Sequence, residues 1–299
     1  MMTVSVPPNR HHSLSFFIAS TLNHSNEVMK KILVPVDFSG MSRNAEDYAV
    51  SLAKAFGAEV HLLHVYREFI PATVGPEPWA VTVSDKRLEN EKLINKEVHY
   101  LKHKHGFDVK TEVEAGARSK IINATAKRIE AGLIVMGMHD GRRNRILGDT
   151  VLNTIRKTKV PVLIIPENIK FTPVKNIVTA VDFSEMLTGA CFDTLFEIYK
   201  EFDASVRVLH VEDPASELKA SEVPEKMQLG LALSRFNYQY DKAEGYDVEE
   251  AISKFTNQHP TDLLVLIAHR HNIYERIFET IHTKDISLKI KQALLVLRQ

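Results

Sequence analysis

The chain contains the same set of segments twice, in the same order. The four matching pairs are KILVPVDFS (31–39) with NIVTAVDFS (176–184), AEVHLLHV (58–65) with ASVRVLHV (204–211), GLIVMGMHD (132–140) with DLLVLIAHR (262–270), and VLII (162–165) with LLVL (294–297). Because all four recur at an almost constant offset, chance similarity is a poor explanation. The pattern indicates a tandem duplication of one folding unit, so a site found in one copy can be checked against the other.

Short apolar runs and amphipathic segments alternate along the first copy. KILVPV (31–36) and VHLLHV (60–65) are rich in β-branched and aliphatic residues, which is typical of strands buried on both faces of a parallel sheet. Between them, residues 41–56 carry apolar side chains at steps of three and four, which predicts an amphipathic helix. Ser39 is the expected N-cap of this helix and Gly57 its end.

The remaining elements complete a repeating strand–helix pattern. In the first copy we expect a Pro-rich loop with Pro71, Pro76, Pro78 and Trp79, helices near 85–105, 117–131 and 146–158, and strands at 109–113, 133–137 and 160–165; in the second, strands near 176–181, 205–211, 236–240, 263–268 and 293–298. Alternating strands and helices favour right-handed crossovers and a parallel sheet. The predicted fold is α/β, with two tandem Rossmann-like doubly wound domains at 29–168 and 169–299, each a five-stranded parallel sheet flanked by helices.

Residues 1–28 differ from the rest of the chain. A brief apolar patch at 13–20 follows Arg10, which is a weak imitation of a secretory signal. Met29 leads directly into the first strand, however, as a start codon would for this fold. We interpret 1–28 as a disordered or over-called extension, and a signal peptide is the alternative.

Composition excludes several classes of function. Lys+Arg and Asp+Glu are equal at 38 each, so no net basic field favours nucleic acid or an anionic membrane. The single cysteine, Cys191, excludes an intramolecular disulfide and suits a reducing cytoplasm. No nucleophile–base pattern, P-loop or GxGxxG dinucleotide motif is present, so the sequence argues against an enzyme.

The ends of the first-copy strands carry the residues suited to a binding site. In doubly wound sheets, ligands bind beyond the C-terminal strand ends, where the strand order reverses. The first strand ends at Asp37, the second at Val65, and the fourth is followed by a segment with glycines and three arginines. Glycines let a backbone approach a ligand closely, and a helix N-terminus offers free N–H groups to phosphate.

On these segments the chain resembles the universal stress protein family. The KILVPVDFS opening, the LLHV and LIVMG strands and the closing VPVLIIP match the family pattern, more clearly in the first copy than in the second. ATP-binding members carry a Gly-x2-Gly-x9-Gly-Ser/Thr loop after the fourth strand. The nucleotide-binding positions that the resemblance implies are Pro35, Asp37, Val65, Met136, Gly137, Gly141, Gly148 and Thr150.

The phosphate loop departs from the family pattern in both copies. Six residues separate Gly141 from Gly148 where the motif has nine, and Asp149 stands at the Ser/Thr position. A carboxylate there repels phosphate unless a metal or arginine intervenes, although Thr150 offers a hydroxyl one residue later. In the second copy no glycine follows Gly245, and Ile267 stands where the first copy has a glycine. ATP, with Mg²⁺, is therefore expected in the first copy only, if it binds at all.

The resemblance implies a cytoplasmic regulatory and binding module of the stress response, acting through protein partners that the sequence does not identify. The two copies are expected to form an internal pseudo-dimer through their last strands, and a further homodimer is open. Two alternatives remain: a nucleotide-independent scaffold and, with least support, a slow ATP hydrolase. No metal site, nucleic acid or membrane is expected.

Several candidate residues also have purely structural explanations. Asp37 is equally suited to hold the first turn of the following helix. His64 and His210, near the ends of buried strands, are interpreted as structural histidines. The loop arginines are interpreted as solvated, and the histidines near 99–105 lack the additional ligands of a zinc site.

Overall fold

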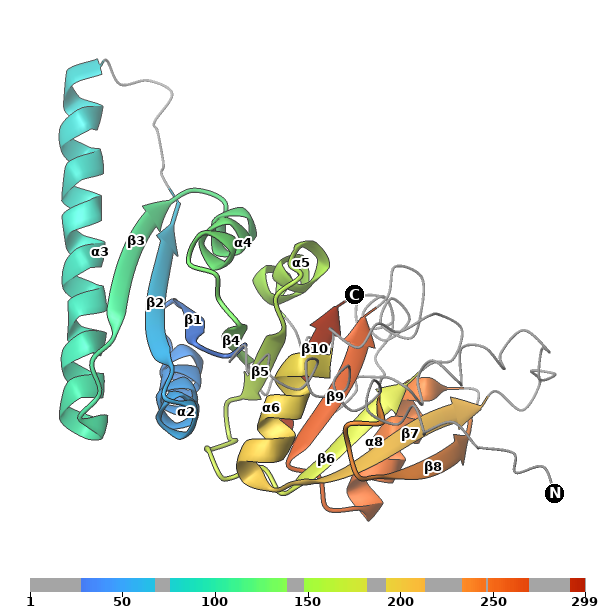
Figure 1. The fold of residues 1–299 in the computed structure, drawn as a ribbon. Helices are drawn as coiled ribbons and strands as arrows, with labels where there is room; N and C mark the ends of the chain where they lie inside the picture. Colours follow the sequence, from blue (N-terminus) through green and yellow to red (C-terminus); the bar gives the residue numbers. More distant parts are fainter. Residues whose placement is uncertain are drawn as a thin grey trace, which may run out of the picture.

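The computed structural model describes residues 28–67, 76–138, 148–181, 192–212, 233–245, 247–268 and 291–298. The two halves of the chain lie side by side and share one continuous sheet (Figure 1). The proposed N-terminal extension lies outside the described residues except for Val28. The Val28 and Met29 backbone N–H groups donate to the Glu197 carboxylate of the second half, the latter at 3.0 Å.

Five strands form the first half of the sheet. Its elements are β1 (Lys31–Val36), α2 (Gly40–Phe56), β2 (Glu59–Tyr66), α3 (Pro76–His105), β3 (Lys110–Ala115), α4 (Arg118–Arg128), β4 (Leu133–Met138), α5 (Asp149–Lys157) and β5 (Val162–Pro166). Helix α2 begins and ends as predicted, because the Ser42 N–H donates to the Ser39 hydroxyl at 3.2 Å and Gly57 takes the left-handed conformation.

The second half repeats this sequence of strands. Its elements are β6 (Asn176–Val181), α6 (Asp193–Phe202), β7 (Ser205–Glu212), β8 (Tyr238–Glu244), α8 (Val248–Gln258), β9 (Leu263–Ala268) and β10 (Ala293–Arg298). All ten strands predicted from the sequence are therefore present.

The strand order is β3-β2-β1-β4-β5-β10-β9-β6-β7-β8. Within each half, every pair of neighbouring strands is parallel, and the order reverses between the first and fourth strands of that half. The predicted fold class, two tandem doubly wound units of five parallel strands, is confirmed. At the centre, β5 and β10 pair antiparallel with Leu163 opposite Leu295, so the last strands of the two halves do meet.

Two hydrophobic cores cover the two faces of the sheet, and each runs through both halves. On one face, the cluster that contains Val34 also contains buried residues of α2, α3 and α6. On the other face, the cluster that contains Leu33 includes residues of α4, α5 and α8. Consecutive strand residues thus enter opposite cores, which explains why the strand sequences are apolar throughout rather than alternating.

Aromatic side chains join the halves on the first of these faces. Phe202 of α6 meets the Phe56 ring of α2 edge-on at 5.7 Å and the Phe171 ring at 6.1 Å, and Phe171 meets Tyr48 of α2 at 5.1 Å. Rings at these separations and angles are in a favourable arrangement. The segment between the halves is also held by Asn44, whose amide donates to the Pro166 and Ile169 carbonyls.

The structure corrects two predicted boundaries. Helix α3 begins at Pro76, not near residue 85, so Pro76, Pro78 and Trp79 belong to a helix and not to a loop. Proline is compatible with the first turn of a helix, where its missing N–H has no intrahelical partner. In the second half, β8 spans Tyr238–Glu244 rather than 236–240.

Candidate functional site

The site begins at the sharp turn that follows β1. Phe38 has a positive φ of 66°, which is unusual for a residue with a side chain. Two contacts from β2 hold the turn: His64 hydrogen-bonds through Nδ1 to the Val36 carbonyl at 2.8 Å, and its ring lies 4.3 Å from the Phe38 ring. His64 is therefore a structural histidine, as predicted.

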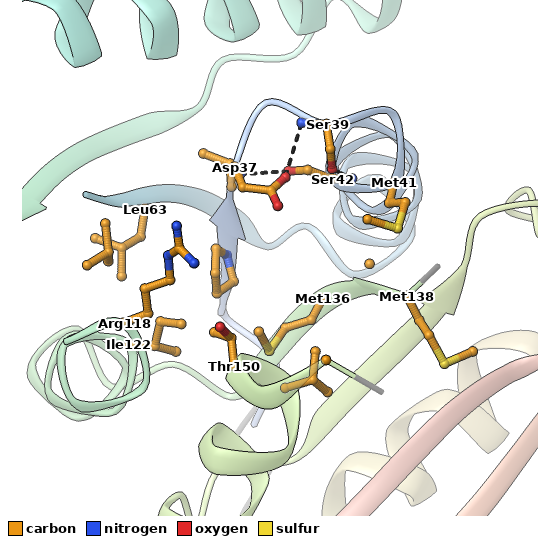
Figure 2. Close-up of a pocket in the computed structure, with 16 residues that line it drawn as sticks. Asp37, Ser39, Met41, Ser42, Leu63, Arg118, Ile122, Met136, Met138 and Thr150 are labelled. Carbon is orange, nitrogen blue, oxygen red and sulfur yellow. Dashed lines mark hydrogen bonds between the residues drawn. The ribbon is translucent and has the colours of Figure 1, made fainter. Parts of the chain in front are cut away.

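Asp37 occupies the tip of this turn and is exposed. Its Oδ1 accepts the Ser39 N–H at 3.1 Å, and its own N–H donates to the Ser42 hydroxyl at 3.3 Å (Figure 2). One carboxylate oxygen thus stabilises the entry into α2, which is the structural explanation that the sequence offered. The other oxygen has no hydrogen bond to any described residue, so Asp37 retains an acceptor for a ligand.

A cavity of about 260 Å³ opens beside Asp37, at the point where the strand order reverses between β1 and β4. It is lined by Pro35, Val36, Asp37, Ser39, Met41, Ser42, Leu63, Val65, Arg118, Ile122, Met136, Gly137, Met138, Gly148, Thr150 and Val151. Seven of the eight candidate residues therefore line one cavity. The eighth, Gly141, lies outside the described residues.

The comparisons with known proteins agree with this architecture. The model of the universal stress protein family matches residues 29–166. The first half of the chain is a universal stress protein domain. A universal stress protein of Methanocaldococcus jannaschii is 28% identical over 156 residues, which cover 51% of this chain and 92% of that protein.

The second half has the universal stress protein fold as well. The crystal structure of a universal stress protein from Archaeoglobus fulgidus covers 90% of this chain and 98% of its own, with 15% identity and a TM-score of 0.65. A functionally unknown protein from Pseudomonas aeruginosa covers 91% of this chain and 93% of its own, with 15% identity and a TM-score of 0.56. These similarities extend over both halves, and at such low identity they concern the fold alone.

The two described glycines of the universal stress protein site have different roles. A Cβ on Gly137 would lie 2.6 Å from the Met41 carbonyl oxygen, so glycine is needed there for α2 to approach β4. A Cβ on Gly148 would meet nothing within 4 Å, although this residue lines the cavity. Among the described residues, the backbone at Gly148, at the N-terminus of α5, is therefore left uncovered.

The position of Asp149 differs from what the motif suggested. Asp149 is the first residue of α5 and is exposed, and it is absent from the cavity lining, whereas Thr150 is part of it. The expected repulsion of phosphate by Asp149 is therefore not tested by the lining of the cavity. The hydroxyl-bearing residue one position later does line it.

A buried carboxylate lies behind the cavity wall. Glu46 of α2 is fully buried, and one of its oxygens accepts the Ser42 hydroxyl at 3.0 Å while the other has no partner among the described residues. Burial, followed by the nearby charge of Glu97, raises the pKa of Glu46 to about 8. Because Ser42 also accepts the Asp37 N–H, hydrogen bonds connect this carboxyl group to the turn that presents Asp37.

Among the cavity-lining residues that the sequence did not single out for binding are Ser42, Ile122 and Arg118. Ser42 lies in the first turn of α2, Arg118 is the first residue of α4, and Ile122 follows it four positions later. The candidate residues came from the ends of β1, β2 and β4, but α4 starts just after β3 and its N-terminus reaches the same edge of the sheet. The two-residue connection from Ala115 to Arg118 was the signal that could have revealed it.

The second half retains only part of this arrangement. His210 hydrogen-bonds to the Val181 carbonyl at 3.3 Å, as His64 does to Val36, so its structural interpretation is also confirmed. The counterpart of Gly137 is Ile267, which is buried within β9. The residues that match Asp37 and the phosphate loop, as well as Cys191 and the loop arginines 142, 143 and 145, lie outside the described residues.

Neither a metal centre nor a membrane helix is found in the part of the chain that the structure describes. Within it, no three or more His, Cys, Asp or Glu side chains are grouped to hold an ion. His105 instead bonds to Asp47 at 2.8 Å, next to Lys104. No helix in the same residues has the length and apolarity needed to cross a bilayer.

Proposed function

We propose that the universal stress protein domain in the first half of the chain binds a nucleoside triphosphate in the cavity beside Asp37 and acts as a regulatory module. ATP is the nucleotide that the family resemblance implies. The base would occupy the end formed by Pro35, Asp37 and Val65, and the phosphates would approach Gly148 and Thr150. Ligand binding at the α5 N-terminus would change which surface the domain offers to protein partners in the cytoplasm.

The observation that carries this proposal is the open space beside Gly148. A polar edge at Asp37, an apolar wall at Val65 and an uncapped helix N-terminus at Gly148 line one cavity. Among the described residues, no atom lies within 4 Å of a Cβ placed on Gly148, the N-cap of α5. This combination suits a molecule with a flat ring at one end and an anion at the other.

Mg²⁺ would arrive with the nucleotide rather than occupy a site of the protein. The described residues hold no carboxylate cluster for it. Mg²⁺ commonly uses phosphate oxygens and waters as most of its ligands. The residues present therefore fit a nucleotide–metal complex whose metal is coordinated mainly by the phosphates.

A scaffold that binds no nucleotide is the second candidate, and specific contacts favour it. Gly137 is explained by the approach of α2, and Asp37 by its bond to the Ser39 N–H. Two of the nucleotide-motif residues would thus be retained for folding alone. A slow hydrolase has weaker support, since no described side chain is arranged as a nucleophile with a neighbouring base.

Calorimetric titration of Mg²⁺-ATP into the nucleotide-stripped full chain tests the proposal. We expect saturable binding near one equivalent, which Asp37→Ala weakens and Gly148→Val abolishes by filling the cavity. Asp85→Ala, a change of an exposed aspartate on α3, is the matched control and should bind as the wild type does. Circular dichroism must show that all variants are folded.

Each other outcome has a defined meaning. Two equivalents would show that the second half also binds nucleotide. Absence of heat at millimolar ATP and GTP would refute the nucleotide proposal and leave the scaffold. Phosphate release that disappears in Gly148→Val would revive the hydrolase.

A further inference from the structure

Arg118 is the one cationic side chain that lines the cavity in the described residues. It begins α4, and its side chain lies beside Leu63 and Ile122 and extends toward the side of the cavity that carries Asp37 (Figure 2). A guanidinium and a carboxylate therefore border the same ligand space.

Within the described part of the chain, the Arg118 guanidinium has no hydrogen bond or ion pair. The Arg118 side chain is exposed, so it is open to a ligand from solvent. Asp37 uses only one carboxylate oxygen, for the Ser39 N–H. Both charged groups can thus meet a ligand without first breaking a contact to the protein.

The neighbours of Arg118 place it at the base end of the cavity. Leu63 and Ile122 lie beside it and are apolar, so they suit the face of a ring and not a phosphate (Figure 2). Thr150 of α5 and its N-cap Gly148 line the same cavity, and the uncapped N-terminus of that helix is the part suited to an anion. A donor fork at Arg118 therefore faces the edge of a base.

The chemistry of the two purines distinguishes them at such an edge. Guanine presents two acceptors side by side, O6 and N7, which an arginine fork binds in a bidentate manner. Its N1–H and N2–H groups are donors that suit a carboxylate. Adenine has an amino group in place of O6, so a guanidinium there would face a donor. We propose that Arg118 and Asp37 make this cavity prefer guanine nucleotides over adenine nucleotides.

This inference rests on the proposed nucleotide function, and a comparison of two nucleotides separates the two claims. GTP and ATP carry the same ribose and triphosphate, so the ratio of their affinities reports the base alone. The experiment titrates Mg²⁺-GTP, Mg²⁺-ATP and Mg²⁺-7-deaza-GTP, which lacks the N7 acceptor, into the nucleotide-stripped full chain. The variants are Arg118→Met and, as the control, Lys120→Met, which removes an exposed charge of the same helix outside the cavity.

We expect GTP to bind about tenfold tighter than ATP, as a bidentate contact typically gives. Arg118→Met should weaken the affinity for GTP about tenfold and leave the affinity for ATP unchanged. The wild-type protein should bind 7-deaza-GTP less tightly than GTP, because one of the two acceptors is missing. Lys120→Met should keep the full preference for GTP over ATP. Equal or tighter ATP binding in the wild type, or an equal loss of both nucleotides in Arg118→Met, would overturn the guanine preference while leaving the nucleotide site in place. If neither nucleotide binds, both proposals fail.

Discussion

Replacing Glu46 by glutamine should remove the pH dependence that this residue gives to the stability of the fold. Glu46 is fully buried in α2, with one oxygen bonded to the Ser42 hydroxyl and the other without a partner among the described residues. Glutamine has nearly the same shape and keeps an oxygen for Ser42, but it cannot ionise. The substitution therefore removes the charge and preserves the packing.

The magnitude follows from the pKa of Glu46, which burial and the charge of Glu97 raise from 4.5 to about 8. In the folded protein Glu46 holds its proton between these values, whereas in the unfolded chain it has lost it. The free energy of unfolding must therefore decrease as the pH rises through this window. Since a tenfold change in acidity equals about 1.4 kcal/mol, the full loss contributed by Glu46 is on the order of 5 kcal/mol above pH 8.

Urea unfolding followed by circular dichroism, at about pH 5 and about pH 9, measures this effect. At the lower pH the variant should be only slightly less stable, by up to about 1 kcal/mol, because its amide leaves two buried N–H donors without an acceptor among the described residues where the protonated carboxyl leaves one O–H. At the higher pH it should be the more stable protein, by several kcal/mol. Burial also raises the pKa of Glu249, to about 7. Because Glu249 is present in both proteins, its contribution to the pH dependence of stability cancels when they are compared. A difference between the two proteins that stays the same at both pH values would refute the reasoning.

Two further substitutions test the packing of the sheet and the junction between the halves. Gly132→Ala should destabilise the fold by about 1–3 kcal/mol, because its Cβ would lie 1.8 Å from the Val28 carbonyl oxygen and backbone must shift. Gly40→Ala, in open space at the start of α2, should be neutral or slightly stabilising in the same urea assay. Phe202→Ala should cost about 3–5 kcal/mol, since the ring is buried against Phe56 across the two halves. A loss below about 1 kcal/mol for either Gly132→Ala or Phe202→Ala would contradict the packing described for that residue.

The fold was accessible from the sequence because its signals are local and occur twice. The run KILVPV is typical of a strand buried on both faces, and its copy at 176–181 made the same prediction independently. The start of α3 was missed for an equally local reason. Pro76 and Pro78 favour a loop when only their neighbours in sequence are considered. The first turn of a helix also tolerates proline, and the three-dimensional structure shows that these two residues lie in the first turn of α3.

The site was accessible only where strand ends define it. Asp37 and Val65 follow from the rule that ligands bind at C-terminal strand ends, and both line the cavity. The short connection after β3 could have pointed to the N-terminus of α4, but which side chains of α4 and α2 face the cavity, Arg118 among them, depends on how these helices are rotated against the sheet. The sequence also did not indicate that Gly137 is required by the carbonyl of Met41, since a glycine that contacts a helix looks the same as one that contacts a ligand.

The duplication separates features of the fold from features of the ligand site. The histidine bond to the end of the first strand occurs in both halves, through His64 and His210, so this bond belongs to the fold. Gly137, which the close approach of α2 requires in the first half, is replaced in the second half by Ile267. Two features of the cavity that the described contacts of the fold do not account for are the uncapped N-terminus of α5 and Arg118, with which no described residue pairs. Changing Arg118 therefore tests the proposed ligand site with the least disturbance of the fold.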